Sequence, residues 1–252
     1  MSGKDKYYNK SKQEGYRSRA AYKLKQLDRA ENLLHEGKTV VDLGAAPGGW
    51  LQVASEEVGE TGTVVGVDLQ RIKDIDGVET VRGDMTEEST KDEVREIAGD
   101  AVDVVLSDMA PNMTGEYSVD HARSVHLARQ AFETALDVLD SGGDFAVKVF
   151  EGQDLEDLRE DIESEFQYVR MLRPDASRDS SSEVYLVGKG RMTAPVEAGD
   201  VVEVEIVDEG SEGDGVAKVE DYTLFVPGAD EGETVEIEVT EVKPRFGFGE
   251  LV

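Results

Sequence analysis

The chain has 252 residues, a formal charge of −29 and no cysteine. This length allows one large domain or two smaller ones, with a substantial core in either case. The lack of cysteine excludes disulfides and thiolate metal sites, and no apolar run reaches the ~18 residues that a membrane-spanning helix needs. The first twelve residues are polar and basic, and no signal-peptide core follows them. We therefore expect a soluble, cytoplasmic protein.

The charge is unevenly distributed along the chain. Residues 1–38 carry a net charge of +5, whereas the remainder carries −34. A uniformly acidic exterior with few lysines indicates a protein from a salt-saturated cytoplasm, as in haloarchaea. Salt of ~1 M screens charges beyond ~3 Å, so an acidic protein can still meet an acidic partner through local contacts. A basic partner is the competing interpretation.

The basic residues near the amino terminus coincide with an expected helix. Ser18 is a candidate N-cap, and Ala21, Leu24 and Leu27 follow at helical spacing, which Leu33 and Leu34 extend. Lysine and arginine occupy the other positions. Either they form a solvated helix face, or residues 1–38 form an arm that binds RNA phosphates. We favour the arm because it is the net-positive segment of a very acidic chain.

Residues 39–188 alternate between apolar strand-like runs and amphipathic helices. This pattern predicts a mostly parallel, doubly wound α/β sheet, whose ligands bind at the carboxyl ends of the strands. The expected strands cover residues 39–43, 63–68, 78–82, 102–107, 144–150, 167–172 and 183–188, and the expected helices cover 48–58, 87–98, 119–140 and 154–165.

The stretch from Val40 to Trp50 organises this part of the chain. An apolar strand runs into a turn rich in small residues, and a helix follows. We expect Gly48 and Gly49 to let a ligand approach the backbone, beside the free N–H groups of the helix. The turn lacks the G-x-G-x-x-G spacing of a dinucleotide site. The alternative is a structural turn without a ligand.

Other polar residues lie at the ends of the expected strands. Asp68 ends the second strand and can accept both hydroxyls of a ribose, although it can also cap a helix. Asp84 and Asp108 follow the next two strands. Lys148 lies within an apolar strand, where lysine is rare without a partner or a task, and Glu183 begins the last strand. By itself Glu183 is an ordinary strand-edge acid.

These motifs together resemble the FtsJ/RrmJ family of S-adenosylmethionine (SAM) dependent RNA 2'-O-ribose methyltransferases. The run Asp42–Trp50 is similar to the first motif of that family, and Ser107–Asn112 is similar to its S-D-x-A-P-N loop. The resemblance covers residues 6–190 and implies a doubly wound methyltransferase domain. It places the catalytic K-D-K-E tetrad and the SAM site on two sets of residues, Lys23, Asp108, Lys148 and Glu183 for catalysis and Gly48, Trp50, Asp68, Asp84 and Asp108 for the cofactor.

The chemistry implied by this resemblance is deprotonation of a ribose hydroxyl beside an activated methyl group. Lys148 in its neutral form can take the proton. Alternatively Lys148 stays protonated and orients the hydroxyl oxygen, while a carboxylate or water takes the proton. Both schemes depend mainly on in-line geometry, worth ~7–11 kcal/mol. Neither needs a metal, and the three histidines show no ligand spacing.

Residues 191–252 have a different pattern, with short alternating strands separated by turns. About five strands in ~60 residues predict a small barrel of the oligonucleotide-binding type. The segment resembles a TRAM domain, a small RNA-binding barrel, although its net charge is −13. Lys243, Arg245, Phe246 and Phe248 are candidates for RNA binding by base stacking and local charge. Aromatic side chains that fill the barrel are the alternative.

We therefore expect domains at residues 1–190 and 191–252. Within the FtsJ/RrmJ family the chain resembles most the enzymes that methylate a uridine of 23S rRNA, and this resemblance implies a SAM-dependent enzyme that acts on the 2'-hydroxyl of such a uridine. Its expected partner is that RNA or the large ribosomal subunit, bound by a monomer. A methyltransferase of the tRNA anticodon loop shares the tetrad and is one alternative. A catalytically idle RNA-binding protein is another, against which the complete tetrad argues.

Overall fold

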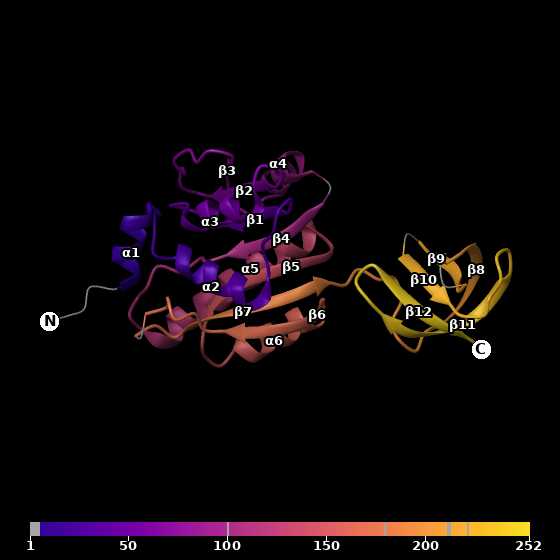
Figure 1. Cartoon of the computed structure of the whole chain (residues 1–252). Helices are drawn as coiled ribbons and strands as arrows, with labels where there is room; N and C mark the ends of the chain where they lie inside the picture. The colour runs from indigo at the N-terminus through magenta and orange to yellow at the C-terminus, as the bar shows by residue number, and fades with distance from the viewer. Residues whose placement is uncertain (1–5, 100, 179, 211–212, 221) are drawn as a thin grey trace. The chain divides into compact units, whose positions relative to one another are not determined.

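The computed structural model describes residues 6–99, 101–178, 180–210, 213–220 and 222–252. The chain divides into two compact units, Met1–Lys189 and Gly190–Val252 (Figure 1). Each unit has its own hydrophobic core, so each is described by itself.

The first unit is built on a mostly parallel sheet. Within the described residues its seven strands have the order β3-β2-β1-β4-β5-β7-β6. Strands β3, β2, β1, β4 and β5 pair in parallel with one another, and β7 is antiparallel to β5. The strands are β1 (Thr39–Leu43), β2 (Thr63–Asp68), β3 (Glu79–Arg82), β4 (Val102–Ser107), β5 (Leu139–Phe150), β6 (Phe166–Leu172) and β7 (Glu183–Arg191). The predicted doubly wound fold is confirmed.

Helices cover both faces of this sheet because its central strands β1, β2 and β4 are buried and apolar on both sides. On β1, Val41 and Leu43 pack into one core with α4, α5 and α6, whereas Val40 packs into the other core with α2 and α3. The helices are α1 (Lys6–Glu14), α2 (Ala21–Glu31), α3 (Gly49–Val58), α4 (Glu88–Ala98), α5 (Tyr117–Val138) and α6 (Leu155–Glu163).

The topology brings distant polar residues to one edge of the sheet. Asp68 ends β2, and Asp108 directly follows β4. Because β7 is antiparallel to β5, its first residue, Glu183, pairs with Phe150 at the end of β5, and Tyr185 pairs with Lys148. The carboxyl ends of the parallel strands and the beginning of β7 therefore meet at the same edge.

The start of α2 differs from the expectation. The helix begins at Ala21, and its N-cap is Ala20, without a side-chain cap. Ser18 is not the cap because it packs against Gly49, where a Cβ atom would lie 2.3 Å from the Ser18 hydroxyl. The helix ends at Glu31, since Asn32 adopts a left-handed conformation.

Leu33 and Leu34 thus lie outside α2, although both are buried. Strand β5 is also longer than expected, beginning at Leu139.

The second unit is a closed barrel with the strand order β10-β12-β11-β8-β9 among its described residues. Its strands are β8 (Val201–Glu209), β9 (Gly215–Val219), β10 (Tyr222–Val226), β11 (Thr234–Val242) and β12 (Phe246–Leu251). Leu224 and Val226 alternate into the core, so Phe225 between them faces outward. The predicted small barrel is confirmed.

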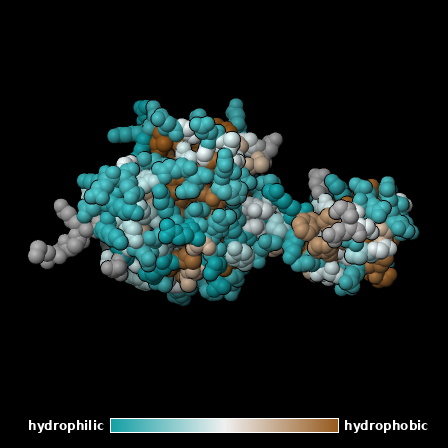
Figure 2. Space-filling view, in the orientation of Figure 1, coloured by the Kyte–Doolittle hydropathy of each residue, from teal (hydrophilic) through white to brown (hydrophobic). Residues whose placement is uncertain are grey.

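The visible face of each unit is mostly hydrophilic (Figure 2), as expected for a chain with 56 acidic residues. None of the helices in the described part of the chain is long and apolar enough to cross a membrane.

Candidate active site

Four charged side chains from four elements meet at the carboxyl edge of the sheet. Lys23 Nζ lies 2.7 Å from Glu183 Oε1 and 3.6 Å from Asp108 Oδ1, and Lys148 Nζ lies 2.9 Å from the same Asp108 oxygen. Lys148 also donates to the Asp108 backbone carbonyl. The four side chains are 7–18% exposed. The structure therefore joins the predicted tetrad residues into one row of alternating charge, Glu183–Lys23–Asp108–Lys148.

Asp108 is the centre of this cluster. Burial alone would raise the pKa of its carboxyl group, but the charges of Lys148 and Lys23 and the hydroxyl of Tyr185 outweigh burial and lower it. Asp108 is consequently an anion at neutral pH, which holds the two lysines side by side.

Tyr185 is a site residue that the sequence reasoning missed. Its hydroxyl donates to Asp108 Oδ1 at 2.6 Å, and Lys23 Nζ lies 5.7 Å from the centre of its ring. Burial raises the pKa of this hydroxyl well above its usual value, so it stays a donor. In an apolar strand a tyrosine looks like core, and the two-residue separation from Glu183 was the signal that it shares the face of that acid.

A cavity of about 440 Å³ adjoins the cluster; we refer to it as the strand-end cavity. Asp108 belongs to the charged cluster and also lines the cavity, so the cavity lies next to the row of charged side chains. Its wall consists of the last two residues of β2, residues that follow β1, β2, β3 and β4, and two residues of α5, namely Gly44, Ala46, Val67, Asp68, Leu69, Gln70, Gly83, Asp84, Met85, Asp108, Met109, Ala110, Leu127 and Gln130.

Two predicted acids lie in this wall in defined hydrogen bonds. Asp68 accepts from the backbone N–H of Ala46 at 2.9 Å and of Gln70 at 2.7 Å, one on each carboxylate oxygen. Each oxygen keeps a lone pair for a further donor, such as one hydroxyl of a vicinal diol. Asp68 therefore shapes the cavity and can still bind a ligand in it.

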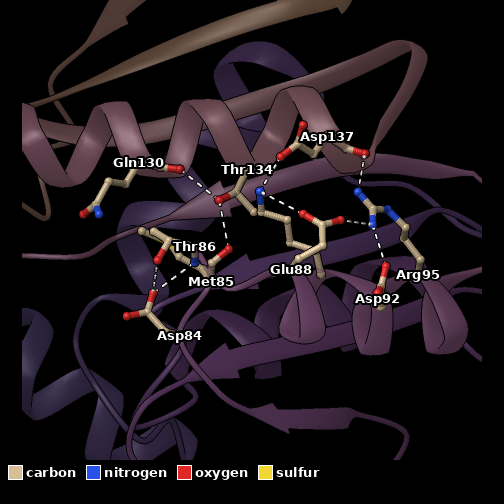
Figure 3. A network of polar contacts seen from close by, with 10 residues as sticks. Asp84, Met85, Thr86, Glu88, Asp92, Arg95, Gln130, Thr134 and Asp137 are labelled. Atoms are coloured by element: carbon tan, nitrogen blue, oxygen red, sulfur yellow. Dashed lines mark hydrogen bonds and ion pairs between the residues drawn. The ribbon is translucent and has the colours of Figure 1, made fainter.

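Asp84 is held by a local turn. Its Oδ1 accepts from the backbone N–H and the hydroxyl of Thr86, and these bonds lower the pKa of Asp84 (Figure 3). The same loop is tied to α5, because the Thr134 hydroxyl lies 3.2 Å from the Met85 carbonyl. The loop that follows β3 is thus anchored where it forms part of the wall of the strand-end cavity.

The surroundings of Gly48 and Gly49 differ from the expectation that a ligand approaches the backbone there. A Cβ atom at Gly48 would lie 2.9 Å from Ile75 Cδ1 and 3.1 Å from Arg17 Nη1, and one at Gly49 would meet Ser18. The protein itself thus fills the space beside these glycines. The φ of 103° at Gly48 gives a second reason for glycine there.

Trp50, another residue assigned to the cofactor, is buried. Its Nε1 donates to the Ala20 carbonyl at 2.8 Å, and its ring packs against Tyr185. Neither Gly48 nor Trp50 is among the residues that line the strand-end cavity.

Asp42 is a second functional candidate that sequence reasoning did not single out. It is 2% exposed, and its Oδ2 has no hydrogen-bond partner among the described residues. Burial raises the pKa of its carboxyl group well above the usual range, and the charges of Asp108 and Asp68 act in the same direction. Its position in an otherwise apolar strand was the available signal.

We expect Asp42→Asn to stabilise the protein increasingly as the pH rises. The pKa of Asp42 in the wild type is higher in the folded state than in the unfolded chain. The contribution of Asp42 to the free energy of unfolding is therefore complete only below the unfolded-state pKa of ~3.9, and it is lost as the pH rises through the folded-state pKa. Asparagine cannot ionise. Urea unfolding at pH 4.5, 6 and 7.5 in constant high salt measures this difference, with exposed Glu93→Gln as the control. A stability difference that does not change with pH would contradict the prediction.

Comparison with known proteins agrees with this geometry. Residues 16–191 match the family model of the FtsJ-like methyltransferases, and residues 195–252 match that of the TRAM domain. The chain belongs to the FtsJ-like methyltransferase family. This member of the family is therefore a methyltransferase that requires a methyl donor, and its second unit is a TRAM barrel.

Its relatives include two haloarchaeal proteins, each named ribosomal RNA large subunit methyltransferase E. The protein of Natronomonas pharaonis is 70% identical and that of Haloarcula marismortui is 66% identical, with 100% of both chains covered in each case. A crystal structure of a Plasmodium falciparum protein, described as a ribosomal RNA methyltransferase, is 29% identical. It covers 70% of this chain and 98% of its own, with a TM-score of 0.64.

Proposed function

We propose that this FtsJ-like methyltransferase transfers a methyl group from SAM to the ribose 2'-hydroxyl of a uridine in 23S rRNA of the large ribosomal subunit. The observation that carries the proposal is the row of two lysines and two acids, which shares Asp108 with the wall of the strand-end cavity. The names of the full-length haloarchaeal relatives support the ribosomal substrate.

The residues of the strand-end cavity fit a nucleoside-bearing cofactor. Asp68 has the lone pairs to accept both ribose hydroxyls, and Asp84 lies where the family resemblance assigns an acid that faces the adenine. Gly48 and Trp50 do not line the strand-end cavity. Gly48 supports the cavity by forming the turn after β1, and Trp50 supports it by packing next to that turn. When bound, SAM supplies a methyl group that its sulfonium charge already activates.

The tetrad positions and deprotonates the ribose hydroxyl. Lys148 either takes the hydroxyl proton in its neutral form, or holds the oxygen with an N–H while a carboxylate or water takes the proton. Asp108 fixes Lys148 through two acceptors, its backbone carbonyl and its carboxylate. Glu183 fixes Lys23 at 2.7 Å. Alignment of the oxygen with the methyl group then makes the main contribution to the rate, since such positioning lowers the activation free energy by ~7–11 kcal/mol.

Radiolabelled methyl transfer in multimolar KCl tests this function. The purified chain is incubated with labelled SAM and with 50S subunits, free 23S rRNA or tRNA in separate reactions. We expect label in 23S rRNA, at the 2'-oxygen of one uridine. Label in tRNA alone would instead favour the anticodon-loop enzyme, and no label in any RNA would favour the idle RNA-binding protein.

The TRAM barrel is proposed to bind RNA through an aromatic cluster on its outer surface. The rings of Phe225, Phe246 and Phe248 lie 5.7–5.9 Å from one another, and none of them belongs to the barrel core. Phe246 is 38% exposed. The alternative that these aromatics fill the barrel is therefore wrong. Phe225 and Phe248 are half-buried beside the exposed Phe246. Aromatic rings at the surface provide stacking surfaces that need no bulk positive charge, which suits a module with a net charge of −13.

We expect Phe246→Ala with Phe248→Ala to weaken RNA binding by about one order of magnitude or more, because base stacking contributes ~1–3 kcal/mol per base. SAM affinity and the melting temperature of the barrel should change little, since both rings lie outside the core. Leu251→Ala, an exposed apolar residue on the same strand, is the matched control. Unchanged RNA affinity in the double variant would exclude the cluster from binding.

A further inference from the structure

Arg17 connects two loops of the proposed SAM site. Its guanidinium group donates to the backbone carbonyls of Pro47 at 3.2 Å, Lys73 at 2.6 Å and Asp74 at 2.7 Å. Pro47 belongs to the turn between β1 and α3, and the other two belong to the segment that follows β2. Both loops form part of the wall of the strand-end cavity, through Ala46 and Gln70. One side chain thus holds the two loops together.

The backbone around Arg17 is fastened to the beginning of α3. The Arg17 N–H donates to Gln52 Oε1 at 2.8 Å, and Gln52 Nε2 donates to the Gly15 carbonyl at 3.2 Å. Gly48 and Gly49 lack the Cβ atoms that would collide with Arg17 and Ser18. The segment 15–20 therefore lies directly on the turn and fixes where the Arg17 side chain starts.

Arg17 lines a second cavity, which shares wall residues with the strand-end cavity. The volume of this second cavity is about 600 Å³, and Arg17, Pro47 and Lys73 are in its wall. Ala46 and Gln70 line both cavities. A displacement of either loop that Arg17 holds would therefore change the shape of the strand-end cavity.

The hydrogen bonds of Arg17 differ from those expected of an arginine that binds an RNA phosphate. Of the five N–H donors of a guanidinium group, three bonds are made to backbone carbonyls of the protein itself. A phosphate ligand needs positive charge above all, whereas bridging three carbonyls on two loops requires the branched geometry of arginine. The two roles therefore predict different behaviour for a lysine at this position.

We propose that Arg17 is a positioning residue of the SAM site, which holds the turn at 44–48 against the segment 69–77, and that it is not part of the RNA-binding arm. The inference rests on the proposed function, since it takes the strand-end cavity as the place where SAM binds. Lys23 lies on α2, which the same segment 15–20 leads into, so loop position and tetrad position are connected through one stretch of chain.

Calorimetric titration with S-adenosylhomocysteine, without RNA, tests the proposal on the full chain in high KCl. We expect Arg17→Ala and Arg17→Lys each to weaken binding by about tenfold or more, because two or three hydrogen bonds to a charged group are lost. Arg29→Ala removes the same charge from an exposed position on α2 and should stay within about twofold of wild type. RNA affinity of Arg17→Lys, measured by filter binding, should equal that of wild type.

Hydrogen exchange supplies a readout that does not depend on the ligand. In both Arg17 variants, backbone amides of residues 69–77 should exchange about tenfold faster or more, while those of the barrel strands stay unchanged. If Arg17→Ala does not fold, Arg17→Lys carries both measurements.

Three results would overturn the proposal. The first is wild-type ligand affinity in Arg17→Lys, and the second is unchanged exchange of residues 69–77. The third is a loss of RNA affinity in Arg17→Ala with ligand affinity retained, which would make Arg17 a phosphate ligand. Wild-type protein that fails to bind S-adenosylhomocysteine would contradict the proposed function instead, and the exchange data would still decide whether Arg17 holds the loops.

Discussion

Replacing Lys148 with alanine is expected to lower the rate of methyl transfer by ~10³-fold or more, in the range that general acid–base groups contribute. Lys148 Nζ is the tetrad amine that Asp108 holds through both a backbone and a side-chain oxygen. SAM affinity should be nearly unchanged, because Lys148 is not among the residues that line the strand-end cavity. Single-turnover methyl transfer and calorimetry measure the two effects separately.

Lys189→Ala is the matched control for this prediction. Lys189 is also a mostly buried lysine paired with a carboxylate, at 2.6 Å from Asp144, but it lies at the far end of β7. We expect full activity from that variant. Intact turnover in Lys148→Ala would remove Lys148 from its proposed role.

Lys148→Arg distinguishes the two schemes for the proton. Guanidinium does not lose its proton in proteins. If Lys148 is the base, arginine should be as inactive as alanine; if it only orients the oxygen, arginine should retain part of the activity.

Replacing Asp108 with asparagine is expected to affect both activity and stability. Without the central anion, Lys23 and Lys148 lose the shared partner to which their Nζ atoms lie 3.6 and 2.9 Å away. Removing one member of a buried ion pair typically costs ~3–5 kcal/mol of unfolding free energy. We expect methyl transfer to fall by ~10²-fold or more, since neither amine stays in place. Chemical denaturation and single-turnover kinetics measure the two losses.

The pH dependence gives this prediction a second test. The pKa of Asp108 is lower in the folded state than in the unfolded chain. Its contribution to stability is therefore complete above the unfolded value of ~3.9 and is lost as the pH falls through the folded value. The stability difference between wild type and Asp108→Asn should shrink under acid.

Glu31→Gln provides the control for Asp108→Asn. Glu31 is a buried carboxylate 2.7 Å from Arg170, on α2 but outside the tetrad. That variant should lose stability and keep its catalytic rate constant. A pH-independent effect in Asp108→Asn, or full activity, would show that Asp108 does not hold the two lysines.

The residues predicted to bind the cofactor fall into two groups, which differ in how far local sequence pattern explains their positions. Asp68 ends a strand, Asp84 and Asp108 follow strands, and parallel strands place such residues at one edge, so local pattern was enough to locate them. Gly48 was expected from the turn rich in small residues, and Trp50 came from the family resemblance. The structure shows that their surroundings are supplied by residues 15–20, about 30 positions earlier in the chain.

The roles of Tyr185 and Arg17 could not be predicted from local pattern. Tyr185 looks like a core residue until the pairing of β5 with β7 brings its hydroxyl to Asp108. Arg17 looks like one more cation in a basic segment until the segment after β2 presents two carbonyls to it. In both cases the deciding partner lies more than 50 residues away.

The amino-acid sequence by itself determined the elements of this protein, namely the mostly parallel sheet and the small barrel, and its resemblance to the FtsJ/RrmJ family singled out the four residues that we propose as the tetrad. Strand and helix periods and short motifs are local, so they can be recognised in the chain alone. Tertiary structure decided which atoms meet: Asp108 between two lysines, Arg17 across two loops, and three phenylalanines outside the barrel core. Those outcomes depend on strand register and on packing between distant segments, and no local pattern encodes them.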